Sequence, residues 1–326
     1  MPKRRRPDPA RDNENEPRIV GATIEAPDED DALRRAIVEW EHAEKIARKR
    51  SASSIEFQRG PVALTFAADL HIGNAGTNYN RIFSEARTVI ETPGMYLALV
   101  GDLIDNYILP KLVHARSNTH LTITDEWVLL KKYLTLVAPK LVASVRGNHE
   151  KWTNILGGLD YFGDALAAVK RSVIYDTDDA LIELRVGAAK FPMRLRHVWR
   201  GSSIYNITHG IERASAFDGY PFAIGVGAHT HTSGVIRSFN CRGAEGYAVL
   251  CGTYKRFDEY AREKGFTRPN ESTAQTLIFF EDGTVLPCGN VARAAETMRR
   301  YANRARGTKH GNVLHYRERQ PTKSTR

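Results

Sequence analysis

Side chains that can bind metal ions or transfer protons stand at the ends of several short apolar runs in this sequence. The runs are VALTFAAD, YLALVGD, KLVASVRGN and FAIGVGAH, and a further histidine stands in the segment ITHG. The side chains at or just after these ends are carboxylates, a carboxamide and imidazoles. In chain order they are Asp69, His71, Asp102, Asp105, Asn148, His149, His209, His229 and His231.

Each of these pieces alone has an ordinary explanation. An Asp-x-His triplet is common by chance, and the pair Gly147-Asn148 could turn a corner, because Gly and Asn tolerate the backbone angles of turns. Ligands of open α/β sheets, however, bind beyond the carboxyl ends of the strands. Five pieces in this order are hard to explain as coincidence, so we expect them to converge on one site.

The elements that must position these residues follow from the apolar pattern. The runs indicate strands that are buried on both faces, and helical patterns around 79–90 and 127–137 separate the early ones. This alternation implies right-handed crossovers and at least partly parallel sheets. Hairpins are expected over 181–199 and in TLIFFEDGTVLP, with a further strand in YAVLCGTY. The body is therefore expected to be α/β with added antiparallel strands.

Composition and cysteine usage are those of a soluble globular protein. Of 326 residues, 42% are hydrophobic and 26% are charged. The 3 cysteines form no CxxC pattern, which indicates reduced thiols and a cytoplasmic location. No apolar run approaches the roughly 18 residues of a membrane span, so we expect no membrane partner.

The net charge of +9 is concentrated at the two ends of the chain. Such basic ends can hold phosphate backbones by counterion release, or they can simply be solvated and aid solubility. The expected organisation comprises a basic and polar flexible tail at 1–27, an N-terminal helical extension at 28–60, one domain at 61–290, and a short helix with a basic flexible tail at 291–326.

The N-terminal extension carries an amphipathic helical pattern. Leu33, Ile37, Trp40 and Ala47 share one stripe, with acids at the start and bases at the end, as a helix dipole favours. We expect this helix to pack on the body. The alternative is that it binds a protein partner or a second copy of the chain.

The order D-x-H, G-D-x-x-D, G-N-H-E, H, G-x-H-x-H resembles that of the calcineurin-like metallophosphoesterase superfamily, over about residues 69–231. The resemblance implies a four-layer αββα sandwich of two mixed sheets flanked by helices. One departure is Ala228, which stands between Gly227 and His229, where the family usually has Gly directly before the final His-x-His.

The resemblance also implies two divalent metal ions. Two metals about 3.5–4 Å apart can clamp a phosphate and activate a water for attack. Asp102 is implied to bridge both ions. Mixed imidazole and carboxylate ligands suit manganese, the ion we expect, or iron, zinc or nickel. The implied further ligands are Asp69, His71 and His231 for one ion and Asn148, His209 and His229 for the other.

Four further residues receive roles around these ligands. By the resemblance, His149 is the acid that protonates the leaving oxygen, a task that suits imidazole at neutral pH. Asp105 and Glu150 either orient a ligand or cap local turns. His197, in RHVWRGSS, is a candidate substrate contact, or else a surface or packing residue.

The substrate is expected to be a phosphodiester of DNA or RNA. The segment GTYKRFDEYAREKGFTRP, residues 252–269, resembles phage-type enzymes grouped with DNA-repair nucleases, and its aromatic and cationic residues can stack bases and track a backbone, unless they are ordinary surface. The alternative is a phosphomonoesterase for phosphoproteins or small metabolites, although GDLIDNY lacks the arginine of the phosphoprotein phosphatase pattern GD-x-x-D-R-G. A third hypothesis is a catalytically inactive nucleic-acid-binding protein.

Overall fold

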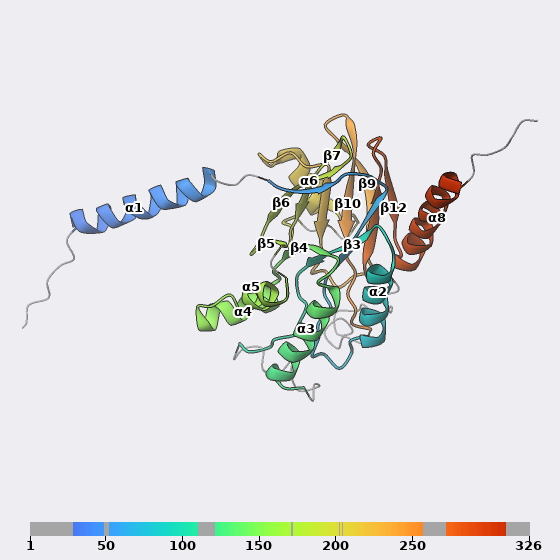
Figure 1. Cartoon of the computed structure of the whole chain (residues 1–326). Helices are drawn as coiled ribbons and strands as arrows, with labels where there is room; N and C mark the ends of the chain where they lie inside the picture. The colour runs from blue at the N-terminus through green and yellow to red at the C-terminus, as the bar shows by residue number, and fades with distance from the viewer. Residues whose placement is uncertain are drawn as a thin grey trace, which may run out of the picture. The chain divides into compact units, whose positions relative to one another are not determined.

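The computed structural model describes residues 29–48, 52–109, 121–170, 172–201, 203, 205–256 and 272–310 (Figure 1). The chain divides into two compact units, Met1–Ser51 and Ala52–Arg326. None of the helices in the described part of the chain is long and apolar enough to cross a membrane.

The described part of the first unit is one helix, α1 (Glu29–Arg48). It begins with three acidic residues, which favour the positive end of the helix dipole. Leu33, Ile37 and Trp40 are exposed, with 62% of Trp40 accessible to solvent. The expected helix is therefore present, whereas its packing on the body or on a partner stays a prediction.

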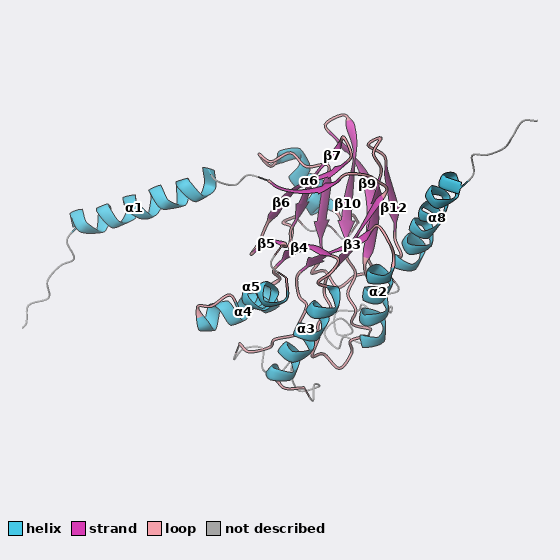
Figure 2. Cartoon of the chain, viewed as in Figure 1, coloured by secondary structure: helices cyan, strands magenta, loops and turns pink. Residues whose placement is uncertain are grey.

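The second unit contains two six-stranded sheets, whose strands gather at its centre in Figure 2. The first sheet runs β1 (Ser53–Phe57), β6 (Ala180–Val186), β7 (Ala189–Leu195), β8 (Ile224–Gly227), β10 (Ala244–Leu250), β9 (Val235–Cys241). The second runs β12 (Val285–Cys288), β11 (Gln275–Phe279), β2 (Val62–Ala67), β3 (Met95–Val100), β4 (Leu141–Val145), β5 (Ile174–Asp176). β2 to β5 pair in parallel, as do β7, β8 and β10, whereas β6–β7 and β11–β12 are antiparallel hairpins. Both sheets are therefore mixed.

The alternation of side chains along β2 shows how the layers stack. Val62, Leu64 and Phe66 belong to the core that both sheets share, because they pack with inward residues of β6 and β7. Ala63 and Ala67 point to the other face, where a second core contains residues of four helices. These helices are α2 (Tyr79–Glu91), α3 (Ile123–Val137), α5 (Tyr161–Val169) and α8 (Val291–His310).

The opposite side of the sandwich carries one helix among the described residues, α6 (His209–Phe217). Its Ile211 and Ala214 pack with Phe222 and with Ala248 of β10 in a third, small core. The order is thus helices, second sheet, first sheet, helix. The expected four-layer αββα sandwich is confirmed, as are the four apolar strands and both hairpins.

The domain is longer at both ends than the expected range of 61–290. At the start, β1 pairs in parallel with β6, with Ser53 opposite Ile182. Five mostly exposed residues carry too little apolar pattern to predict this strand. At the end, α8 continues to His310 and buries Val291 and Met298 in the core, so it is neither short nor separate from the domain.

Candidate metal centre

The polar residues of the motifs lie where strands from both sheets end. Asp69 follows β2 and Gly101 follows β3, and the backbone N–H of Asp69 donates to Gly101 O at 3.0 Å. The N–H of His229, after β8 of the other sheet, donates to Asp69 Oδ2 at 2.9 Å. Four chemically active residues stand two positions beyond the last residue of their strand. They are Asp69, Asp102, His197 and His229, after β2, β3, β7 and β8.

Four of the expected ligands form one compact group. One ligand atom from each of Asp69, His71, Asp102 and His231 lies within 4.8 Å of those of the others. His71 Nε2 and His231 Nε2 are 2.9 Å apart. This is the set that the resemblance implies for one metal ion, and the fold brings all of it together.

A second group shares Asp102 and consists of Asp102, His197 and His229. His197 Nδ1 lies 2.7 Å from Val100 O and must donate to it, since a carbonyl oxygen only accepts. The other ring nitrogen, Nε2, lies 3.0 Å from Asp102 Oδ2 without the alignment of a hydrogen bond. Burial lowers the pKa of His197, but the charge of Asp102 outweighs it and raises that pKa to about 10.

His209 is not brought into either group. It is exposed and is the first residue of α6, where its backbone N–H donates to Asn206 O at 3.0 Å. Its assignment to the second ion stays a prediction, and among the described histidines His197 holds the corresponding place beside Asp102. The signal that would have found His197 is its position two residues beyond a strand, which requires the end of β7 to be known.

Asn148 begins α4 (Asn148–Gly157), and its Oδ1 is buried without a hydrogen-bond partner. The glycines of the two motifs explain how the loops approach so closely. A Cβ on Gly147 would lie 2.1 Å from Asp102 Oδ1, and one on Gly101 would lie 2.6 Å from Gly147 Cα. Any side chain at either position would push the loops of β3 and β4 apart, together with Asp102 and Asn148.

Left-handed backbone conformations concentrate at this centre. Among the described residues, seven other than glycine have positive φ. Such conformations are uncommon for residues other than Gly and persist where the surrounding structure enforces them. Five of the seven are expected metal ligands, namely Asp69, His71, Asp102, His229 and His231, with φ between 47° and 77°.

Asp105 orients His71. Its Oδ1 lies 2.8 Å from His71 Nδ1, so it fixes the proton on Nδ1 and leaves Nε2 for a ligand. Its Oδ2 accepts from Asn74 Nδ2 at 2.8 Å, and Lys255 Nζ lies 3.5 Å from Oδ1. Burial raises the pKa of Asp105, and Lys255 opposes that rise. Of the two readings of Asp105, the contacts support orientation of a ligand.

Glu150 ties together the two loops that carry Asp102 and Asn148. Its carboxylate accepts from the backbone N–H of Asp102 at 3.1 Å and of Gly147 at 2.9 Å, and also from that of Leu103. Burial and the charge of Asp102 raise the pKa of Glu150 to about 7. The bond to Gly147 is a local cap, whereas the other two are long-range and brace the site.

His149 is buried, with 6% of its surface accessible. Its backbone N–H donates to Asp102 Oδ1 at 3.0 Å, and its Nδ1 faces Asp105 O at 2.5 Å. Nδ1 must therefore carry a proton, and Nε2 lies 3.7 Å from Asp102 Oδ2. Burial lowers the pKa of His149. The imidazole is thus held with its second nitrogen toward the carboxylate that both groups share.

The side chains present fit divalent metal ions. Buried polar atoms normally have a hydrogen-bond partner. Four that have none belong to candidate metal-ligating side chains of this centre: Asp69 Oδ1, Asp102 Oδ2, Asn148 Oδ1 and His197 Nε2. Carboxylate, carboxamide and imidazole donors together suit first-row transition metals.

The described part of the segment 252–269, which follows β10, is mostly buried, whereas a nucleic-acid contact would have to lie on the surface. Tyr254 is buried and donates to Glu85 Oε2 at 2.6 Å, and Lys255 is buried beside Asp105. Neither is an exposed residue that tracks a backbone, because residues 253–255 pass beneath the loop of Asp69 rather than over the surface. Arg256 is exposed, and residues 257–269 lie outside the described residues.

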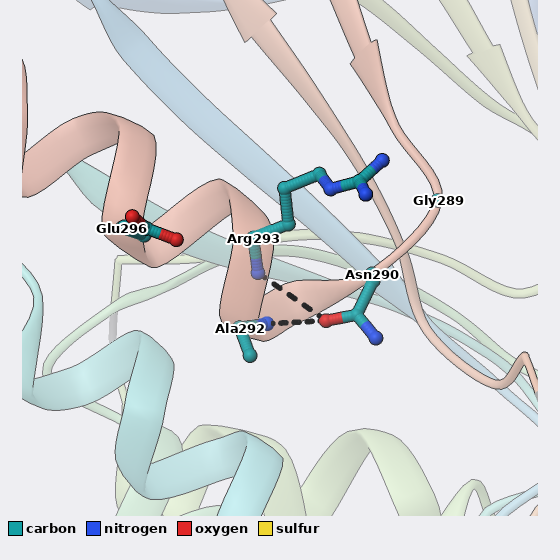
Figure 3. Close-up of a pocket in the computed structure, with 5 residues that line it drawn as sticks. All are labelled: Gly289, Asn290, Ala292, Arg293 and Glu296. Atoms are coloured by element: carbon teal, nitrogen blue, oxygen red, sulfur yellow. Dashed lines mark hydrogen bonds between the residues drawn. The ribbon is translucent and has the colours of Figure 1, made fainter.

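A surface hollow of about 500 Å³ lies at the start of α8, away from these motifs (Figure 3). It is lined by Gly289, Asn290, Ala292, Arg293 and Glu296. Asn290 Oδ1 accepts from the N–H of Ala292 at 2.8 Å and of Arg293 at 3.3 Å. The carboxamide oxygen of Asn290 is thus occupied in capping the helix.

No protein-family model matches the sequence, and no curated protein sequence matches it. Solved structures do match. Vacuolar Protein Sorting 29 from Cryptosporidium parvum has a TM-score of 0.34 and 15% identity, over 70% of this chain and 96% of that one. The nuclease MPE of Pseudomonas putida has a TM-score of 0.34 and 14% identity, over 69% and 87%. The 5'-nucleotidase of Candida albicans has a TM-score of 0.35 and 10% identity, over 78% and 59%.

These structural neighbours share 10–15% of their residues with this chain, at TM-scores of 0.34–0.35. At such TM-scores they assign neither an activity nor a family to this chain.

Proposed function

We propose that this chain is a two-metal phosphoester hydrolase that acts on the phosphodiesters of DNA or RNA. The observation that carries the proposal is the position of Asp102. Three groups of candidate ligand atoms occur among the described residues, and Asp102 belongs to two of them, the third being His71, Asp105 and His149. His149 Nε2 lies 3.7 Å from Asp102 Oδ2. A shared carboxylate beside a buried imidazole is what a two-metal hydrolase needs.

The first ion would be held by Asp69, His71, Asp102 and His231. The second would be held by Asp102 and His229 together with Asn148, whose Oδ1 is unpaired, and with His197. When bound, two such ions clamp a phosphate and supply a water that is acidic enough to attack it. Manganese, iron, zinc and nickel all suit these donors.

The protein's own part in catalysis is to hold a transferable proton on Nε2 of His149. The Nδ1–H of His149 is held by Asp105 O, so the proton that His149 can transfer is one carried on Nε2 of the doubly protonated imidazolium, which the charge of Asp102, with Oδ2 3.7 Å away, favours. His149 donates it to the leaving oxygen, a contribution worth about 10²–10⁴-fold in rate. Glu150 keeps the loops of Asp102 and His149 in register, because its carboxylate binds N–H groups of both.

Two features support a diester over a monoester. A dianionic monoester favours a bidentate arginine clamp. Arg146, the arginine nearest to the GNH motif in sequence, is instead directed to Asp160, at 3.3 Å. The net charge of +9 favours association with a polyanion. A phosphomonoesterase remains the second candidate because the same two groups of ligands would serve it.

The test is degradation of end-labelled single- and double-stranded DNA in Mn²⁺, with Asp102→Asn as the control. We expect wild type to cut and the variant not to, because the substitution removes the charge shared by both groups. Cutting by the variant at the wild-type rate would contradict the two-metal assignment. Hydrolysis of p-nitrophenyl phosphate with no cutting of DNA would favour the phosphomonoesterase.

A further inference from the structure

Two aromatic rings pack against the imidazole of His149. The centroid of the Trp152 indole lies 4.2 Å from that of His149, with an interplanar angle of 34°. The Tyr107 ring lies 5.2 Å from His149 and 5.7 Å from Trp152, at 30° to the indole. The three rings form one cluster that ends at the metal centre, where His149 also contacts His71 edge to face at 4.7 Å.

This cluster is held in place by Asn106. Asn106 Nδ2 donates to His149 O at 2.6 Å and to Thr153 Oγ1 at 2.8 Å. Its backbone is left-handed, with φ of 46°, and its N–H donates to Glu126 Oε2 at 2.7 Å. One residue thus anchors the loop of Tyr107 to the helix of Trp152. Polar contacts, two of them buried, therefore hold together the two segments that carry the rings.

The two outer rings are not core residues. Tyr107 and Trp152 are each partly exposed, and neither belongs to the three apolar cores of the described part of the chain. Lys255 Nζ, which is buried beside Asp105, lies 5.9 Å from the Tyr107 centroid and supports that ring from its inner side. Rigid, half-exposed aromatic rings are the surfaces on which the bases of single-stranded nucleic acid stack.

We propose that Trp152 and Tyr107 form a stacking platform for the nucleobase attached to the leaving oxygen of the scissile phosphodiester. His149 is the residue that gives a proton to that oxygen, and the rings contact His149 directly. The base on the leaving side is therefore the part of the substrate that reaches them. This inference rests on the proposed function and names the part of the substrate that the site selects.

The platform predicts a preference for substrates that carry bases over substrates that carry only a sugar-phosphate backbone. Stacking of one base on an aromatic side chain is worth about 5- to 150-fold in affinity. The probes are an eight-nucleotide oligothymidine and a matched oligonucleotide with abasic sites. Binding is measured by fluorescence anisotropy with Ca²⁺ in place of Mn²⁺, and recovery of intact oligonucleotide is checked on a gel.

The variants are Trp152→Ala, which removes the ring, and Trp152→Phe, which keeps a ring and guards against misfolding. Trp40→Ala removes an exposed indole of α1 and is the matched control. We expect wild type and Trp40→Ala to bind oligothymidine about tenfold more tightly than the abasic probe. Trp152→Ala should lose most of this preference, and Trp152→Phe should keep part of it.

Equal affinity of wild type for both probes, or an unchanged preference in a folded Trp152→Ala, would overturn the platform. Base-dependent binding with no cutting in Mn²⁺ would overturn the proposed hydrolysis and support the platform. Cutting of DNA in Mn²⁺ together with equal affinity for the oligothymidine and the abasic probe would support the proposed hydrolysis and overturn the platform. The two conclusions therefore fail separately.

Discussion

His197 Nε2 lies 3.0 Å from Asp102 Oδ2, and the two residues come from different sheets. The other nitrogen of His197 binds Val100 O, the carbonyl of the last residue of β3. The ring is thus held between the two layers, with Nε2 directed at the carboxylate of Asp102. This placement supports the proposal that His197 is a ligand of the second ion and not a substrate contact.

We expect His197→Ala to lower the metal content by about one ion per chain, because it removes a ligand atom from the second group. The measurement is metal analysis of the purified variants by mass spectrometry. His209→Ala is the matched variant and should retain both ions, since His209 is exposed at the start of α6. If His209→Ala lost an ion and His197→Ala did not, the assignment of His209 from the motif order would be correct.

His149→Ala should keep both metal ions and lose about 10²–10⁴-fold in turnover number, because general acid help is worth that much. The readout is kcat on oligonucleotide together with metal content. A larger effect on a substrate with a poor leaving group than on a p-nitrophenyl ester would identify the lost function as proton donation. Loss of a metal ion would instead make His149 a ligand.

Glu150→Ala should lower the free energy of unfolding by at least about 2 kcal/mol, because buried N–H groups that it now satisfies would be left unpaired. Glu150→Gln keeps one acceptor oxygen and should cost less. Urea denaturation measures both changes, with Glu91→Ala on the exposed end of α2 as the control. A cost for Glu150→Ala no larger than that of Glu91→Ala would show that the carboxylate does not brace the loops.

Removal of metal ions should lower the melting temperature. The carboxylates of Asp69 and Asp102 are both buried and repel each other, and burial together with the charge of Asp102 raises the pKa of Asp69. Cations that bind only the folded chain at about 100 times their dissociation constant stabilise it by about 2.7 kcal/mol, or roughly 5–10 °C for a domain of this size. Calorimetry with and without chelator checks this.

The shift on adding Mn²⁺ should be lost in Asp102→Asn, which lacks the shared carboxylate. An equal shift in wild type and variant would place the stabilising ions elsewhere on the chain.

The fold could be predicted from the sequence because most of the motifs directly follow an apolar run, so each such motif marks the end of a strand and the strand supports the reading of the motif. Asp69 and Asp102 follow continuous apolar runs, so both the strands and the residues beyond them were recognisable. His197 follows β7, whose alternating pattern marked a hairpin but not the place where its second strand ends. The motif order pointed to His209 for that reason, whereas only the three-dimensional strand ends distinguish the two histidines.

Contacts between distant segments could not be read from the sequence. The burial of Tyr254 depends on Glu85, which lies 169 residues earlier in the chain. β1 was missed because its pairing with β6, and not its own composition, makes it a strand. Local pattern predicts where an element stands, but the partner of a polar or short segment is decided by the packing of the whole domain.

The division of the centre between the two sheets has a consequence for how the chain acquires its chemistry. The second sheet supplies Asp69, His71 and Asp102, and the first supplies His229 and His231. A nascent chain released up to β5 would hold Asp69, His71 and Asp102 without the two imidazoles of the later sheet. The complete set of candidate ligands is therefore assembled only when the two layers pack on each other, so we expect neither half of the domain alone to bind both metal ions.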